Sequence, residues 1–291
     1  MIINDLKKSG LINPPNFILT NTQLLVLSGS TSYGVSGSVS DWDLVGICIP
    51  SKEELFRPGV IPGFGKPKKR FSTWQKHHIN YKEKEYDITI YNIVDFFNLC
   101  MSANPNLVDI IFTPDNCVIH STSIGDMIKE NRHLFLSKLC WPRFKGYAYQ
   151  MLKKLENKNP KKGSKRDELI KKHGYDTKYS YHLVRLLNEV EQILATGDLD
   201  LQLDKERLKA IRRGEWTVEQ IKQFFSDKER DLETLYLNSE LPFEPREEEI
   251  KTLLIKCLEA HYDDISNHIV VPGKAEAALR KIQDIISPIL K

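Results

Sequence analysis

The chain has 291 residues, of which 41% are hydrophobic and 28% are charged, a composition typical of globular proteins and long enough for two domains. No apolar run approaches the ~20 residues that a membrane-spanning helix needs, and the N-terminus carries no visible secretion signal, so a soluble, cytoplasmic protein is expected. Its five cysteines are widely separated and lack zinc-ligand spacing, which favours reduced thiols over a disulfide framework or a zinc site.

Positive charge is concentrated in one part of the chain. The net charge is +3, but residues 138–178 carry +9, which leaves −6 for the remainder. This basic block indicates a polyanionic partner, although a solvated Lys-rich surface without function would give the same pattern. The residues predicted to bind RNA are Lys145, Lys153, Lys154, Lys161, Lys162, Lys165 and Arg166.

Two short apolar runs near the N-terminus predict buried strands. Residues 24–27 (LLVL) are followed by Gly29, and residues 44–50 (LVGICIP) end at a proline. The Ser- and Gly-rich segment between them indicates a tight connection that can approach a ligand closely, and Gly29 and Ser30 are expected to open a short helix there. Residues 57–70 are predicted to form an exposed loop with a basic tip.

The next segment predicts a hairpin. Residues 71–93 contain two β-prone runs joined near residues 82–84. In the second run, Ile88 and Ile90 share one face and Asp87 lies on the other, because side chains alternate along a strand.

The chain then becomes helical in pattern. Helical periodicity begins at Val94, and Asn104 followed by Pro105 is typical of a helix cap and first helical residue. Beyond about residue 122, strand signals are scarce. The predicted fold class is therefore α+β, with a small mixed-sheet catalytic domain (1–121) followed by a mainly helical, basic domain (122–291).

Three aspartates are candidate catalytic residues and metal ligands. Asp41 and Asp43 stand at the start of the second strand, ten residues after Gly29-Ser30, and their Cβ atoms should lie on one face roughly 6–7 Å apart. Two carboxylates so placed can share two Mg²⁺ ions, which prefer oxygen ligands. Asp87 is the candidate third carboxylate, because it interrupts an apolar run. An Asp-x-Asp or a Gly-Ser pair alone is more often surface charge or a plain turn, but their combination with Asp87 favours a metal site.

These motifs resemble those of a known superfamily. The Gly-Ser pair and the DWDL segment are similar to the glycine-loop and paired-acid motif of the DNA polymerase β-like nucleotidyltransferases. Longer segments, residues 28–47, 85–112 and 174–201, resemble the branch of predicted nucleotidyltransferases associated with RNA repair in bacteria and phages. The likeness extends from about residue 22 to 225.

The resemblance implies both a fold and roles for matching positions. It implies a mixed-sheet catalytic domain followed by helices, with Gly29 and Ser30 in the phosphate loop, Asp41 and Asp43 as the metal pair and Asp87 as the third carboxylate. Asp109 stands where such relatives often have Glu, so the role of that position stays open.

A second polar constellation lies in the helical part. Lys178, His182 and Arg185 are spaced at i, i+4 and i+7, so they share a helix face that could clamp a triphosphate or an RNA backbone. The alternative interpretation, given equal weight, is that these residues form an exposed basic stripe without a binding role. The predicted nucleotide-binding residues are Gly29, Ser30, Ser40, Lys178, His182 and Arg185.

The function predicted from these residues is Mg²⁺-dependent transfer of a nucleoside monophosphate from a nucleoside triphosphate to a hydroxyl acceptor, with release of pyrophosphate. The expected acceptor is an RNA 3′ end in RNA repair or modification. Two alternatives stay open: transfer to a small-molecule or protein hydroxyl, and a catalytically silent RNA-binding protein. Nucleotide preference and oligomeric state are not specified by the sequence.

Overall fold

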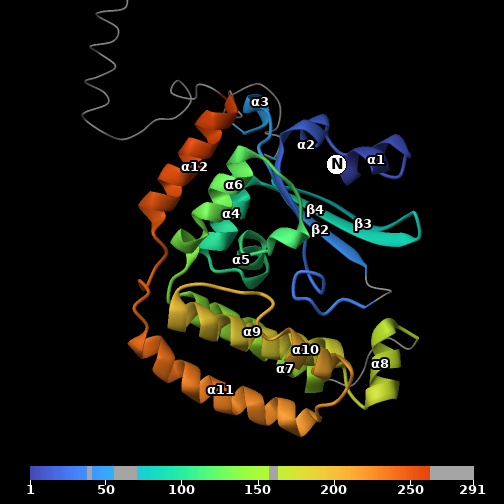
Figure 1. The fold of residues 1–291 in the computed structure, drawn as a ribbon, viewed down its shortest axis with the longest axis vertical. Helices are drawn as coiled ribbons and strands as arrows, with labels where there is room; N and C mark the ends of the chain where they lie inside the picture. Colours follow the sequence, from blue (N-terminus) through green and yellow to red (C-terminus); the bar gives the residue numbers. More distant parts are fainter. Residues whose placement is uncertain (38–40, 56–70, 157–162, 263–291) are drawn as a thin grey trace, which may run out of the picture.

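The protein is built on a five-stranded mixed sheet with helices on both faces (Figure 1). The computed structural model describes residues 1–37, 41–55, 71–156 and 163–262. The strand order is β3-β4-β2-β1-β5, with β2 and β4 parallel and the other neighbouring pairs antiparallel. The strands are β1 (Thr22–Leu27), β2 (Trp42–Cys48), β3 (Thr73–Tyr81), β4 (Lys84–Asn92) and β5 (Val118–Ser121). The predicted α+β class is confirmed.

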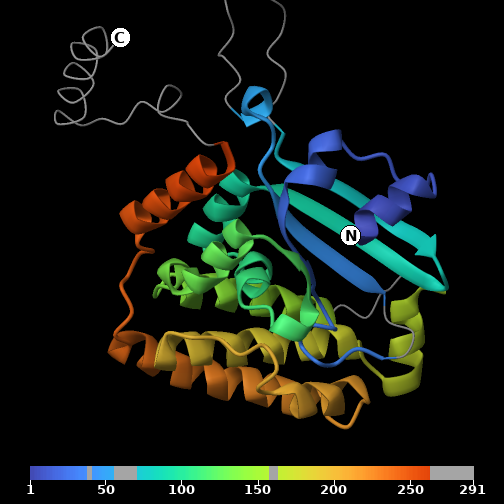
Figure 2. The same ribbon diagram turned by 45° about the horizontal axis from the view of Figure 1, so that its top comes forward.

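Each face of the sheet carries its own apolar core. Leu25 and Leu27 of β1 pack under α1 and α2, whereas Leu24 and Val26 of the same strand face a larger core on the opposite side. This alternation is the period-2 pattern of a strand buried on both faces. Figure 2 shows the two groups of helices on either side of the sheet. The helices nearest the sheet are α1 (Ile2–Lys8), α2 (Asn16–Asn21), α4 (Ile93–Met101), α5 (Pro105–Ile111) and α6 (Ser123–Glu130).

The second half of the described chain is helical. A bundle of long helices lies beyond α5 in Figure 1, and the last helix of the described residues returns to pack near α4 and α6. The larger apolar core continues from β1 through α4 and α5 into this bundle. These helices are α7 (Cys140–Glu156), α8 (Lys165–His173), α9 (Thr177–Thr196), α10 (Lys205–Arg212), α11 (Val218–Asn238) and α12 (Glu247–Tyr262); a short α3 (Lys52–Leu55) follows β2.

Most of the expected elements are present. The two apolar runs form β1 and β2, and the hairpin turns between β3 and β4 where it was predicted. Asn104 caps α5 through its side chain, with Pro105 at the first helical position. The division at residue 121 stays a prediction. Among the described residues, no helix is both long enough and apolar enough to cross a bilayer.

One local expectation was wrong. Gly29 and Ser30 do not open a helix; residues 29–34 form consecutive turns. Gly29 and Gly34 both have positive φ (+63° and +66°), so left-handed backbone brackets the segment and prevents an α-helical turn from continuing. The predicted loop at 57–70, Ser40, Lys161 and Lys162 lie outside the described residues.

Candidate active site

Asp43 and Asp87 are neighbours in the sheet. The parallel register of β2 and β4 pairs them directly, and adjacent strands lie ~4.8 Å apart. Both side chains project from the face that carries α4 and the helical bundle, because the alternate residues Leu44 and Ile88 belong to the core under α1 and α2. Asp41 directly precedes β2, and its charge acts on Asp43. The three predicted aspartates therefore gather at one end of the sheet.

The Asp43 carboxyl group lies in a repulsive environment. Its pKa is raised to about 6, first by burial and then by the charge of Asp87, with a smaller contribution from Asp41. Lys178 and His77 act in the opposite direction but do not cancel the rise in pKa. Partly buried carboxylates that carry excess negative charge bind a divalent cation favourably, because the cation relieves their repulsion.

The glycine loop (residues 28–35) lies against this carboxyl group. Ser28 donates its backbone N–H to the Asp43 carbonyl oxygen at 2.7 Å, which continues the pairing of β1 with β2. A Cβ atom added to Gly29 would lie 2.5 Å from Oδ2 of Asp43. Gly29 is therefore needed both for its positive φ and because any side chain there would collide with the carboxylate.

Long-range contacts hold the far side of the glycine loop. Gln202 donates to the Ser32 carbonyl oxygen at 3.2 Å, and Arg212 donates to the Val35 carbonyl oxygen at 2.6 Å. The Tyr33 hydroxyl donates to Oδ2 of Asp109 at 2.7 Å. These contacts hold the loop against α5 and against residues 202–212 of the helical half of the protein.

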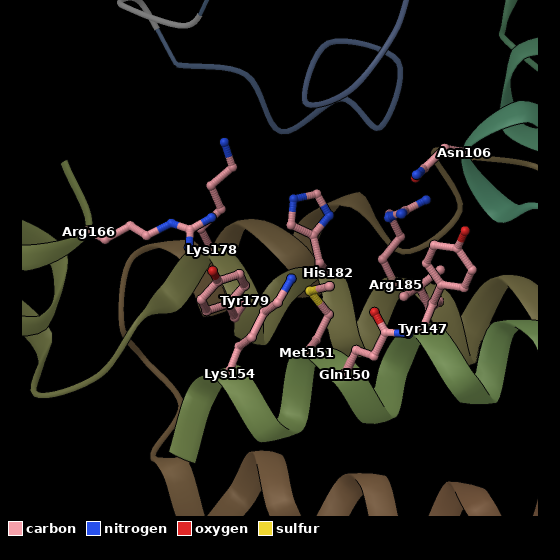
Figure 3. Close-up of a pocket in the computed structure, with 11 residues that line it drawn as sticks. Asn106, Tyr147, Gln150, Met151, Lys154, Arg166, Lys178, Tyr179, His182 and Arg185 are labelled. Atoms are coloured by element: carbon pink, nitrogen blue, oxygen red, sulfur yellow. The ribbon is translucent and has the colours of Figure 1, made fainter. Parts of the chain in front are cut away.

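A cavity of about 320 Å³ opens between α7 and α9 (Figure 3). Lys178 and His182 both line this cavity, in agreement with the prediction that they share one face of a helix. Lys178 is exposed, and it lies close enough to Asp43 to lower the pKa of that carboxyl group. Burial and the nearby cations Arg185 and Lys178 lower the pKa of His182 well below its ordinary value, so its ring is neutral at pH 7.

Comparison with known proteins assigns the chain to a family. Residues 19–263 match the RNA repair pathway DNA polymerase beta family. The chain belongs to this family. A search of curated proteins found no match. Among solved structures, a nucleotidyltransferase-like protein from Exiguobacterium sibiricum is similar at 12% identity, with 81% of this chain and 73% of that chain covered and a TM-score of 0.29.

In this RNA repair family protein, Arg185 lies in a buried ion cluster instead of on an open basic stripe. Its Nη1 donates to Oδ2 of Asp109 at 2.5 Å and to both carboxylate oxygens of Glu189 at 2.9 Å. The guanidinium carbon lies 4.3 Å from the centroid of the Tyr33 ring. Arg185 also lines the cavity, but its charge is already neutralised by two buried carboxylates. Asp109, whose role the sequence left open, is thus a partner of Arg185.

The basic residues predicted to contact RNA occupy different places. Lys154 and Arg166 line the cavity, and Lys153 lies over the Tyr149 ring at 4.7 Å. Lys145 forms ion pairs of 2.9 and 2.8 Å with Glu229 and Glu233 of α11, so it belongs to the contact between α7 and α11. The Lys165 side chain lies outside the part of the chain that the structure describes.

Sequence reasoning missed a set of possible metal ligands at the hairpin. Among the described residues, His78, Glu85 and Asp87 bring one ligand atom each within 4.8 Å of one another. A bulge in β3 gives His78 a positive φ of 55° and turns its backbone N–H to Oδ1 of Asp87 at 2.7 Å. The predicted turn near residue 83 could have indicated this group, because hairpin pairing places position 78 opposite positions 85–87.

Proposed function

We propose that this protein is a Mg²⁺-dependent nucleotidyltransferase that transfers a nucleoside monophosphate from a nucleoside triphosphate to a hydroxyl acceptor and releases pyrophosphate. The observation that carries the proposal is the Asp43–Asp87 pair, with its raised Asp43 pKa, directly beside Gly29 and within electrostatic reach of Lys178. Membership of the RNA repair pathway DNA polymerase beta family supports it.

The donor set suits Mg²⁺. Asp41, Asp43 and Asp87 offer hard carboxylate oxygens, and the two that are paired in the sheet repel each other when both are ionised. These three aspartates would hold the metal. When bound there, Mg²⁺ would supply charge neutralisation for the triphosphate and activation of the acceptor hydroxyl.

Protein groups around the carboxylates have distinct roles in this proposal. Backbone N–H groups of the glycine loop at Gly29 and Ser30 donate to phosphate oxygens, which approach closely because residue 29 lacks a side chain. Lys178 supplies a positive charge to the phosphates. His182 is neutral and offers one donor and one acceptor, so it orients the nucleotide without adding charge.

The proposed acceptor is an RNA 3′ end. The cationic side chains of Lys154 and Arg166 border the cavity that contains Lys178, and Lys153 lies on the same helix as Lys154. Attraction between such groups and phosphates is independent of sequence and weakens as salt rises. A family defined by RNA repair supports an RNA acceptor over a small molecule.

The direct test is transfer of label from each α-labelled nucleoside triphosphate to pooled small RNAs in the presence of Mg²⁺. Asp41→Ala is the inactive comparison, and Asp231→Ala, an exposed change on α11, is the matched control. Labelled RNA with the intact protein and the control, but not with Asp41→Ala, is the expected result. Unlabelled RNA together with Mg²⁺-dependent triphosphate binding would refute the RNA acceptor, and absence of that binding would refute the enzyme.

A further inference from the structure

The cavity between α7 and α9 has a cationic end. Arg166 and Lys154 approach the ring of Tyr179, with the guanidinium carbon 4.2 Å and the Lys154 Nζ atom 5.5 Å from the ring centroid. Lys178, the preceding residue on α9, lines the same end. Lys178 lies close enough to Asp43 for the two charges to interact, so this end of the cavity lies toward the carboxylates.

The other end of the cavity carries neutral hydrogen-bonding groups. Figure 3 shows Asn106, Gln150 and Tyr147 away from Lys178 and Arg166, beside Arg185. Asn106 lies in the first turn of α5, and Gln150 lies on α7 one helical turn before Lys154. Within the part of the chain that the structure describes, neither side-chain amide has a hydrogen-bond partner in the protein.

The spacing of the two ends suits one nucleotide. Lys178 and Arg185 are seven positions apart on α9, which corresponds to ~10 Å along the helix axis. That span is comparable with the separation of a nucleobase from the terminal phosphates of its triphosphate. The volume of about 320 Å³ lies within the usual range for a small-molecule pocket.

We infer that this cavity binds the nucleoside triphosphate lengthwise, with the phosphates at Lys178 and the base at Asn106 and Gln150, and that it selects adenine. This inference rests on the proposed function and adds the identity of the substrate.

The hydrogen-bonding groups that line the cavity favour adenine over the other bases. A side-chain amide offers one donor and one acceptor group, which match adjacent acceptor and donor atoms on an adenine edge. Guanine presents two neighbouring donors on its Watson–Crick edge, for which a carboxylate is the matched acceptor, and no carboxylate is among the described lining residues. A pyrimidine ring would bury less apolar surface against Met151 and Leu186.

The test is calorimetric binding of ATP, GTP, CTP and UTP to the full-length protein with Mg²⁺. ATP should bind about ten- to a hundredfold more tightly than GTP. Gln150→Leu should weaken ATP binding about tenfold and reduce the preference, and Gln150→Glu should shift the preference toward GTP. Gln223→Leu, on the exposed surface of α11, should leave all four affinities unchanged. Gln150 is itself exposed, so its variants should keep the wild-type unfolding temperature.

The outcomes separate this inference from the proposed function. Equal Mg²⁺-dependent binding of all four triphosphates, or an ATP preference that survives Gln150→Leu and Gln150→Glu, would overturn the assignment of the base and leave the nucleotidyltransferase proposal standing. Absence of Mg²⁺-dependent binding of any triphosphate would instead refute the proposed function.

Discussion

Two groups of carboxylates lie on either side of the glycine loop, and their charges are balanced in different ways. In the buried cluster, Asp109 and Glu189 share the guanidinium group of Arg185 at 2.5 and 2.9 Å. At one end of the sheet, Asp43 is paired with Asp87 on the neighbouring strand. Burial is the largest cause of the raised pKa in Asp43, Asp109 and Glu189 alike. Among the residues that the structure describes, only the last two form an ion pair with an arginine.

The difference distinguishes a structural charge cluster from the proposed ligand site. Where a protein cation already neutralises buried carboxylates, the ion cluster has a structural role, and its carboxylates have no free negative charge with which to bind a ligand. Where partly buried carboxylates repel each other, as Asp43 and Asp87 do, a cation from solution would bind favourably.

Substitution of Asp43 should have the largest effect on activity and should not lower stability. Asp43→Asn removes a proposed metal ligand, so we expect nucleotidyl transfer to fall by about a thousandfold or more. Stability should be unchanged or higher, because the substitution also removes repulsion with Asp87. Asp227→Asn, on the surface of α11, is the matched control. Activity close to wild type in Asp43→Asn would contradict the assignment.

Substitution of Arg185 should act mainly on stability. Arg185→Met leaves two buried carboxylates without their cation, and we expect a loss of about 3–5 kcal/mol in the free energy of unfolding, measured in urea. Lys178→Met, at an exposed position on the same helix, should cost less than about 0.5 kcal/mol while weakening triphosphate binding.

A rescue experiment sharpens this prediction. Combining Arg185→Met with Asp109→Asn and Glu189→Gln removes the buried negative charge, so part of the lost stability should return. A stability loss in Arg185→Met no larger than that in Lys178→Met would show that the cluster is not the structural element described.

The dependence of stability on pH should reveal the Asp43 carboxyl group. Its pKa of about 6 in the folded state lies above its unfolded value, so the folded protein binds more protons between about pH 4 and pH 6. Stability contributed by this group is therefore present at low pH and is lost as pH rises through 6, by on the order of 1–2 kcal/mol after solvent screening. Unfolding in urea at pH 5 and pH 7, with a chelator present, measures it.

Asp43→Asn is the comparison for that measurement. Asp109 and Glu189 titrate in both proteins, so the difference between wild type and variant isolates Asp43. Equal pH dependence in the two proteins would mean that Asp43 is not in the repulsive environment described. Mg²⁺ binds the ionised form, so the apparent Mg²⁺ affinity of the wild type should fall below pH 6.

The smallest effect is expected at Gly29. Gly29→Ala and Gly10→Ala both place a side chain at positive φ, which should cost about 1 kcal/mol of stability at Gly10 and at least as much at Gly29. Only at Gly29 would the new Cβ meet Asp43, whereas nothing lies within 4 Å at Gly10. Gly29→Ala should therefore also weaken Mg²⁺-triphosphate binding several-fold, as measured by calorimetry. Equal binding by the two variants would argue against contact between the loop and the metal ligands.

The sequence predicted what depends on local pattern. Alternation along the strands placed Ile88 on one face and Asp87 on the other, and the Asn104-Pro105 pair marked the start of α5. Asp87 was grouped with Asp43 because it interrupts an apolar run and because of the family resemblance; strand pattern alone could not predict their proximity, since the parallel pairing of β2 with β4 depends on the order of strands in the sheet.

Long-range pairing limited the prediction of the site. Arg185 has the spacing of an exposed basic stripe, but its partner Asp109 lies 76 residues away, and no local pattern indicates that contact. Glu189, four residues after Arg185, was a usable sign that the charge is paired. The cavity itself depends on how α7 packs on α9, so Asn106 and Gln150 could not be grouped with Lys178 from the sequence.

The most direct test of the contrast between the two carboxylate groups is to replace Mg²⁺ with Mn²⁺ and to measure Mn²⁺ binding by electron paramagnetic resonance. We predict that wild type binds Mn²⁺, that ATP tightens this binding, that Asp43→Asn abolishes it, and that Glu189→Gln leaves it unchanged. Mn²⁺ binding by Asp43→Asn as tight as by wild type would contradict the account.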